Sequence, residues 1–500
     1  MSEYGTVIST QDGPCTRKFS FVIKKGETVR RGQFVEVAVE GGRLIGRVAD
    51  VFKTNRYFAR PESVERYESS KPMEDIFPVG NWEYLVAEVA PLGVYGSEGR
   101  FEEVSFPPSP GTKVSEPEHA ILAKFLGLDD KGLEIGELPY HNIKVRLNLT
   151  RLLQKHLAIL AISGAGKSYL VSVLIEEMLR RTKEEGQIAT VIIDTHGEYS
   201  SFAEDPVYAD RVKVFRADEI KINFSRLSSR EISIFFPNLS APQKRALNKL
   251  FKKLKKGGAQ YTLEDLKTEL KEDEDAETKT KDTLDDIFRE LEESRLFGRE
   301  DCPSAKELAH QGKISIIDLS SSLSSSNKQM IVEHLARNLF SLRRSGEIPP
   351  LLLVLEEAHQ FIPEKQKAET AIARGILNTI AREGRKFHTS LCLISQRPVQ
   401  LSTTVLSQCN THIILRVTNP YDLKHIGQSS EGITNDVLDQ ISGLRVGTGL
   451  IVGEAVNYPI FVRIRKRKSK ESSKGMPLED AAREFSNREK KKKEDAKSFM

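Results

Sequence analysis

The stretch HLAILAISGAGKS, residues 156–168, decides the fold of this chain. Its apolar half is typical of a strand buried in a parallel sheet, and its glycine-containing half is typical of a loop that leads from such a strand into a helix. In such a loop the backbone N–H groups cradle phosphates, Lys167 neutralises the terminal phosphates, and the Ser168 hydroxyl holds Mg²⁺. Ala161 stands where the usual pattern has its first glycine, which predicts a negative φ there. The candidate nucleotide-binding residues are Ser163, Gly164, Ala165, Gly166, Lys167, Ser168 and Tyr169.

A second buried-strand pattern, LLLVLEE at residues 351–357, ends in two adjacent carboxylates. Bare charge is costly to bury, so these carboxylates are expected to bind something. Hydrolysis of a Mg²⁺ nucleotide needs a metal-orienting carboxylate and a group that positions the attacking water. We predict that Glu356 serves the metal and Glu357 the water, and that their strand neighbours the strand of the phosphate loop. The alternative is a pair of solvated acids that begin a loop.

Two further strand ends carry polar candidates. IIDTHGEY, residues 192–199, places Asp194, His196 and Glu198 at the carboxyl end of a strand, where ligands of parallel sheets bind. Asp194 and Glu198 are expected to tune the metal or the catalytic water; an independent metal site is the alternative. Gln396 follows the strand 390–395 and is a candidate sensor of the γ-phosphate.

The segment IAREGRKF, residues 380–387, gathers cations at a helix end. A helix lying along the sheet cannot easily bring these cations to its own phosphate loop. We therefore predict that Arg385, or its neighbour Arg382, reaches the nucleotide of an adjacent subunit as an arginine finger. The alternative is that the cations complement the dipole of the helix.

The order of these patterns predicts the domains. Residues 1–112 alternate apolar and polar positions with a Gly41–Gly42 turn, which predicts an all-β barrel for assembly or docking. Strands then alternate with helices, which predicts an α/β core with a parallel sheet in two parts, 113–225 and 311–467. Residues 226–310 lack strand patterns and predict an inserted helical subdomain, with helix starts at Ser240 and Thr262. Residues 468–500 form a basic tail.

Composition restricts the class of protein only in part. A net charge of +4 over 500 residues neither favours nor excludes nucleic acid. The four cysteines lack a C-x-x-C pair, which fits a reducing compartment and offers no metal-site spacing. We see no signal peptide and no apolar run of the length that spans a bilayer, so the expected location is cytoplasmic, without a membrane.

Together, ISGAGKS, DTHGEY, LEEAH, AREGRKF and SQRP, in this order, resemble the HerA family of archaeal DNA translocases, relatives of the FtsK-type pumps. The resemblance covers nearly the whole chain. It implies a RecA-like ATPase core that uses ATP and Mg²⁺ and a homohexamer that threads double-stranded DNA through its pore. It also implies a partnership with the NurA nuclease in DNA end resection, beside Mre11–Rad50.

The same resemblance assigns roles to residues. Lys167 and Ser168 would bind phosphate and metal, Asp194 and Glu357 would support hydrolysis, and Arg385 would act in trans. Lys155 takes a place where relatives carry an arginine near the nucleotide. Lys365 and Lys367 are candidates for gripping DNA phosphates, with a plain charged loop as the alternative. The rival functions are a conjugation or segregation pump and a non-motor nucleotide switch whose barrel docks a protein.

Overall fold

The computed structural model divides the chain into two compact units. Unit 1 comprises residues 1–132, 136–147 and 456–463, and unit 2 comprises 133–135, 148–455 and 464–500. The structure describes residues 2–9, 13–55, 58, 62, 64–65, 68, 83–96, 99–256, 260–274, 276–321, 323–365, 370–430, 432–470, 479–480 and 482–487. In these ranges no helix is both long and apolar enough to cross a membrane.

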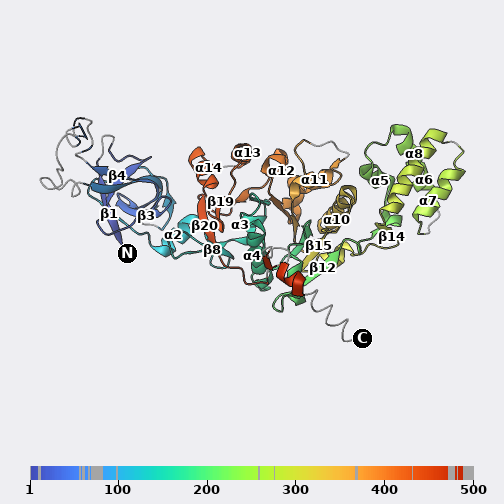
Figure 1. The fold of residues 1–500 in the computed structure, drawn as a ribbon, viewed down its shortest axis with the longest axis horizontal. Helices are drawn as coiled ribbons and strands as arrows, with labels where there is room; N and C mark the ends of the chain where they lie inside the picture. The colour runs from blue at the N-terminus through green and yellow to red at the C-terminus, as the bar shows by residue number, and fades with distance from the viewer. Residues whose placement is uncertain are drawn as a thin grey trace. The chain divides into compact units, whose positions relative to one another are not determined.

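Unit 1 contains the predicted β-barrel (Figure 1, blue). Its strands follow the order β2-β1-β7-β3-β4-β5-β6, and a β2–β5 pairing closes six of them into a barrel, with β6 beside β5. The predicted Gly41–Gly42 turn joins β3 to β4, and Gly41 has the positive φ of 96° that glycine tolerates. The strands are β1 (Glu3–Ile8), β2 (Phe19–Ile23), β3 (Phe34–Val39), β4 (Gly42–Asn55), β5 (Glu83–Gly96), β6 (Phe101–Glu102) and β7 (Lys113–Ser115).

Alternation of side chains builds the barrel interior. In β2, Phe19, Phe21 and Ile23 are buried while the residues between them are partly exposed. They pack with Leu44 and Val89 from β4 and β5 in one apolar cluster. Helix α2 (His119–Leu126) follows the barrel strands, and strand β9 (Lys144–Leu147) comes later in unit 1. The boundary between the two units passes through β8 (Leu133–Glu137) and β20 (Ile460–Ile464).

Unit 2 contains the predicted α/β core. Its strands follow the order β12-β15-β11-β16-β17-β10-β18-β19, parallel except for β19, which is antiparallel to β18. Most of these strands are almost entirely buried, as their continuous aliphatic sequences predict. They are β10 (Leu157–Leu160), β11 (Ala189–Asp194), β12 (Val212–Arg216), β15 (Ile314–Asp318), β16 (Leu351–Leu355), β17 (Thr389–Ser395), β18 (Thr411–Ile414) and β19 (Thr448–Gly453).

The sheet order corrects one prediction. We expected the strand that carries Glu356 and Glu357 to neighbour the strand of the phosphate loop, but β17 pairs with both β10 and β16 and separates them. The acids nevertheless reach the loop because all three strands are parallel and end at the same edge of the sheet. Gln396, which follows β17, therefore lies at that edge between the loop and the acids.

Helices connect the parallel strands, as right-handed crossovers require. Outside the segment 226–310, the two longest are α4 (Lys167–Arg180), which follows the phosphate loop, and α10 (Ser325–Arg344). The others are α3 (Leu149–Leu153), α9 (Ala305–Leu308), α11 (Arg374–Glu383), α12 (Thr403–Leu406), α13 (Pro420–Ser429) and α14 (Asn435–Ser442). Short 3₁₀ turns lie at 200–204, 209–211, 224–226, 358–360, 384–387 and 398–400.

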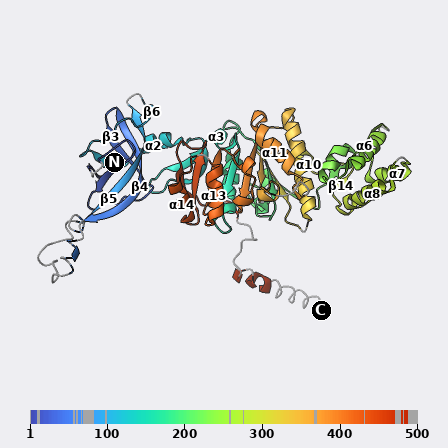
Figure 2. The ribbon, with the colours of Figure 1, turned by 90° about the horizontal axis from the view of Figure 1, so that it is seen from above.

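The predicted helical insertion is present (Figures 1 and 2, green). It contains α5 (Ser229–Phe235), α6 (Ala241–Lys256), α7 (Leu263–Glu272) and α8 (Thr278–Glu293). Both predicted helix starts are confirmed: Ser240 N donates to Gln243, and Thr262 forms a capping box with Asp265. A short parallel pair, β13 (Ile222–Asn223) and β14 (Phe297–Gly298), forms the neck through which the chain enters and leaves the insertion. The domain boundaries given above stay predictions.

Candidate active site

The phosphate loop runs from β10 into α4 with the backbone that its sequence predicts. Gly164 and Gly166 have φ angles of 77° and 94°, which disfavour any residue with a Cβ. A Cβ at Gly164 would meet nothing within 4 Å, so backbone conformation rather than space requires glycine there. Ala161 is buried and is not among the residues with positive φ, as predicted. Lys167 begins a helix of 14 residues, so free N–H groups and the positive end of the helix dipole lie at the loop.

Lys167 contacts both predicted acids. Its Nζ lies 2.6 Å from Glu357 Oε1 and 3.8 Å from Glu356 Oε1. The two carboxylates are 1% and 0% exposed, so this contact lies in a largely dry site. Glu357 has a left-handed backbone, with a φ of 48°, immediately after β16. Strained backbone of this kind persists only where the surroundings impose it, and it is common at functional sites.

Glu356 is anchored to the loop that follows β11. Its Oε2 accepts hydrogen bonds from Thr195 N at 3.0 Å, Thr195 Oγ1 at 3.1 Å and His196 N at 3.2 Å. Burial raises its pKa, but the bond to His196 and the charge of Lys167 outweigh burial and hold the pKa of Glu356 at about 2. Glu356 is therefore an anion at neutral pH.

Asp194 organises the same loop rather than facing its opening. Its two oxygens accept hydrogen bonds from four consecutive backbone N–H groups, those of His196, Gly197, Glu198 and Tyr199. Burial, followed by the negative charge of Glu356, raises the pKa of Asp194 to about 7. We infer that Asp194 positions His196 and Glu198.

Several oxygens suit a divalent cation at this site. Glu356 Oε1 and Glu198 Oε2 are buried and accept no hydrogen bond from any described residue. The Ser168 hydroxyl bonds the Glu198 side chain, and burial raises the pKa of Glu198. His196, Glu356 and Glu357 also offer ligand atoms within 4.8 Å of one another. Hydroxyl and carboxylate oxygens are the ligands that Mg²⁺ prefers, so Ser168 and Glu356 fit the predicted metal.

His359 was missed by the sequence analysis. Its Nδ1 lies 3.2 Å from Glu357 Oε2 and 3.2 Å from Ser395 Oγ, so it stands between the predicted catalytic acid and the end of β17. Burial lowers the pKa of His359, which keeps the ring neutral at neutral pH. The sequence signal was its place two residues after Glu357. Nothing in the sequence indicated that Ser395 would meet it.

Three predicted residues lie away from their own phosphate loop. Arg382 and Arg385 are exposed and precede β17, and Lys155 precedes β10, whereas the loop follows the other end of β10. Lys155 forms an ion pair with Glu454. The structure therefore does not bring Lys155 to the nucleotide site of its own chain. Arg385 is likewise not brought to the phosphate loop of its own chain, and its action on an adjacent subunit stays a prediction.

The segment after β20 packs on the helix of the phosphate loop. Arg465 bonds Glu176 at 2.7 Å and Glu177 at 2.8 Å, and Glu176 also accepts from the backbone of Lys468 and Ser469. Arg467 N donates to the hydroxyl of Tyr169, a predicted nucleotide ligand, at 2.6 Å. The first residues of the predicted tail are thus bound to α4 through Lys468 N and Ser469 N, and Lys470 N donates to Asp205.

Fewer contacts are defined for the remaining predicted site residues. Gln396 is half-buried at the edge of the sheet where the phosphate loop lies. Lys365 is exposed in the loop that follows the acids. Lys367 lies outside the described residues.

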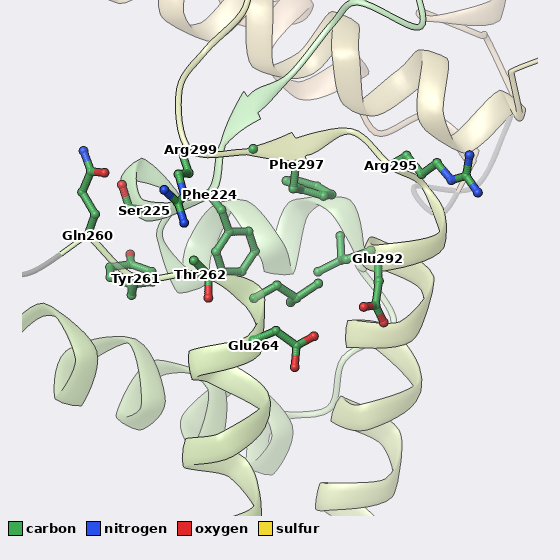
Figure 3. Close-up of a pocket in the computed structure, with 13 residues that line it drawn as sticks. Phe224, Ser225, Gln260, Tyr261, Thr262, Glu264, Glu292, Arg295, Phe297 and Arg299 are labelled. Atoms are coloured by element: carbon green, nitrogen blue, oxygen red, sulfur yellow. The ribbon is translucent and has the colours of Figure 1, made fainter.

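A separate cavity of about 470 Å³ lies in the helical insertion (Figure 3). Phe224 and Phe297 meet edge to face across it, with ring centroids 5.8 Å apart. Arg299 reaches toward Phe224, whereas the Arg295 side chain points away from the cavity (Figure 3). None of the predicted site residues is among those that line it. The aromatic rings form part of the core that joins the neck to the helices.

Comparison with known proteins identifies the family of this chain. A model of the family described as "Helicase HerA, central domain" matches residues 133–339. The chain is 30% identical over 464 residues to the DNA double-strand break repair helicase HerA of Saccharolobus solfataricus, an alignment that covers 87% of this chain and 88% of the relative. It is 27% identical over 506 residues to a probable helicase of Methanocaldococcus jannaschii, with 96% and 94% covered.

Solved structures agree on the fold. VirB4 of Thermoanaerobacter pseudethanolicus aligns with a TM-score of 0.54 and 18% identity, over 68% of this chain and 99% of that chain. This likeness shows that the α/β core shares its fold with VirB4. The resemblance noted in the sequence is confirmed, and the chain belongs to the HerA family of helicase ATPases.

Proposed function

We propose that this protein is a hexameric, ATP-driven translocase on double-stranded DNA that works with a NurA-type nuclease in resecting DNA ends at double-strand breaks. The observation that carries this proposal is the alignment over 88% of a relative named as a double-strand break repair helicase, together with the phosphate loop and acid pair of this chain. The barrel would dock the nuclease, and Mre11–Rad50 is a further partner. The location expected for this work is cytoplasmic.

ATP binding changes the partners of Lys167. In this structure Lys167 forms an ion pair with Glu357 at 2.6 Å. When a triphosphate occupies the loop, the ammonium group turns to the phosphate oxygens and releases the Glu357 carboxylate. Glu357 then accepts the proton of the attacking water. Gln396 would sense the γ-phosphate from the end of β17.

Ser168 and Glu356 would hold Mg²⁺, which when bound neutralises charge on the phosphates. Glu356 is suited to this because three hydrogen bonds to its Oε2 fix the carboxylate while Oε1 stays free of described donors. Asp194 contributes by holding the loop that presents Thr195 and His196 to Glu356.

A ring would allow a second subunit to complete the site. The exposed Arg385 would approach the nucleotide of the adjacent copy and stabilise charge in the transition state. Lys365 and Lys367 would face the pore and contact DNA phosphates without reading sequence.

The test is the ATPase rate with and without linear duplex DNA, for the natural protein, Lys167→Ala and Glu357→Gln. We expect duplex DNA to stimulate the natural protein several-fold and neither variant to respond. Stimulation should weaken as salt rises, because phosphate contacts release counterions. An ATPase that is active but indifferent to duplex DNA would reject the translocase in favour of a nucleotide switch.

A further inference from the structure

His359 has no role in the function described so far, yet it occupies a decisive place. Its ring is 12% exposed and lies against the buried carboxylate of Glu357. The Nδ1 atom is 3.2 Å from Glu357 Oε2, which accepts no hydrogen bond from any described residue. Burying a carboxylate oxygen without a hydrogen-bond donor costs free energy. A rotation of the His359 ring would direct an N–H group at Glu357 Oε2.

The other neighbour of Nδ1 connects it to the strand between the acids and the phosphate loop. Ser395 Oγ lies 3.2 Å from His359 Nδ1 and accepts a hydrogen bond from Arg397 N at 3.1 Å. The carbonyl of Ser395 accepts from Ala161 N, at the start of the phosphate loop. His359 therefore bridges the acid that ends β16 and the end of β17, which flanks the loop.

The imidazole can serve only one of these partners with a single Nδ1–H. While Lys167 holds Glu357 Oε1, the carboxylate is already neutralised, and the Nδ1–H can donate to Ser395 Oγ instead. Once a triphosphate draws Lys167 away, Glu357 loses that partner. An Nδ1–H directed at Oε2 then fixes the carboxylate and leaves Oε1 facing the water.

We propose that His359 is the positioning residue for the catalytic base, Glu357: its Nδ1–H holds Glu357 Oε2 after ATP has withdrawn Lys167. This inference rests on ATP hydrolysis at this site and is independent of DNA. His359 touches neither nucleotide nor water in this role and acts through Glu357.

The test uses basal ATPase kinetics without DNA on His359→Ala, His359→Asn and His359→Gln. Asparagine places an N–H near the position of Nδ1, whereas glutamine extends its N–H toward the position of Nε2. We expect His359→Ala and His359→Gln to lower kcat by about 10-fold to 100-fold, the effect of one hydrogen bond to a charged group, with little change in KM for ATP. His359→Asn should retain most of kcat.

Two controls separate positioning from folding. His425→Ala removes another histidine, whose ring bonds the Leu401 carbonyl, and should leave kcat unchanged. His359→Ala placed in the Glu357→Gln background should cause no further loss, because the histidine acts through that carboxylate. Melting temperatures identify any variant that fails to fold.

A kcat of His359→Ala equal to that of the natural protein would overturn the proposal. So would equal losses in the folded Asn and Gln variants, or a rise in KM with kcat unchanged. All of these His359 assays omit DNA. If the protein hydrolyses ATP but is not stimulated by duplex DNA, the translocase proposal is refuted, whereas the His359 proposal can still be tested.

Discussion

Lys167 and Glu357 hold each other in this structure, so ATP has to separate an ion pair before it can use either residue. The pair is nearly buried, with 11% and 1% of the side chains exposed, and is therefore worth more than a pair in water. The ion pair neutralises the charge of Lys167, the residue predicted to bind phosphate. The same pairing opposes the binding of phosphate.

Removing the charge of Glu357 should consequently tighten nucleotide binding while it stops hydrolysis. We expect Glu357→Gln to bind an ATP analogue about threefold to tenfold more tightly than the natural protein and to lose about 100-fold or more in kcat. Titration with a fluorescent analogue and single-turnover assays measure the two effects. Glu364→Gln, which alters a carboxylate bonded to Thr403, is the matched control and should change neither. Weaker binding of the ATP analogue by Glu357→Gln would contradict the proposal that Lys167 leaves Glu357 for the phosphates.

Residues inside local patterns were predictable, and those joined by tertiary structure were not. The sequence was enough to predict that Lys167, Glu356 and Glu357 belong to the site, because each follows the end of a strand pattern. The partnership of His359 with Ser395 could not, because the two lie 36 residues apart and meet only once β16 and β17 pair. Asp194 was found in the right region, but its four backbone partners depend on the turn of the loop after β11.

At the scale of elements, the parallel sheet could be predicted while its order could not. Continuous aliphatic runs identified β10, β11, β15, β16 and β17 as buried strands. These strands have similar aliphatic sequences, so the sequence contains no signal that β17 lies between β10 and β16. Register and order come from how the crossover helices pack.

Helix starts in the insertion were predictable because capping is local. Thr262 and Asp265 bond reciprocally at the start of α7. We expect Thr262→Ala to lower the stability of the insertion by about 1 kcal/mol, because a backbone N–H loses its acceptor. Thr268→Ala, in the exposed middle of the same helix, should be neutral or slightly stabilising. Hydrogen exchange of α7 measures both; equal effects would contradict the role of the cap.

At the scale of the whole molecule, buried histidines make stability depend on pH. Burial lowers the pKa of His141, His156 and His412 to about 4 each, whereas the unfolded chain protonates them near 6.5. The unfolded state therefore binds more protons below pH 6.5. Stability contributed by these groups is complete above pH 6.5 and falls as the pH drops toward 4, by about 2 kcal/mol per histidine at pH 5.

The expected result is a melting temperature that decreases steadily from pH 7 to pH 5. Because His156 accepts from Leu391 N and contacts the Ala381 carbonyl, His156→Gln should flatten this dependence while lowering stability at pH 7. His310→Gln alters an exposed histidine and should leave the slope unchanged. A pH-independent melting temperature would show that the folded and unfolded states bind protons equally over this range, so that the three rings do not have lowered pKa values.

Assembly is the last prediction at this scale. If Arg385 acts on the adjacent copy, Arg385→Ala should form normal oligomers and hydrolyse ATP at least 100-fold more slowly. Mixing it with Lys167→Ala should restore part of the activity, since some interfaces then pair a complete loop with a natural arginine. Arg382→Ala, also exposed at the end of α11, is the matched comparison. Intact oligomers without rescue would place the arginine outside the site.

The neck of the insertion has a consequence for how this chain can change. Lys221 and Cys302 exchange backbone hydrogen bonds of 2.7 and 2.9 Å, so the polypeptide returns to the spot from which it left. Excision of residues 222–301 needs only a tight turn to reconnect the ends, and the threading of the sheet stays the same. At this bridge one inserted subdomain can therefore be exchanged for another without a change in the ATPase core.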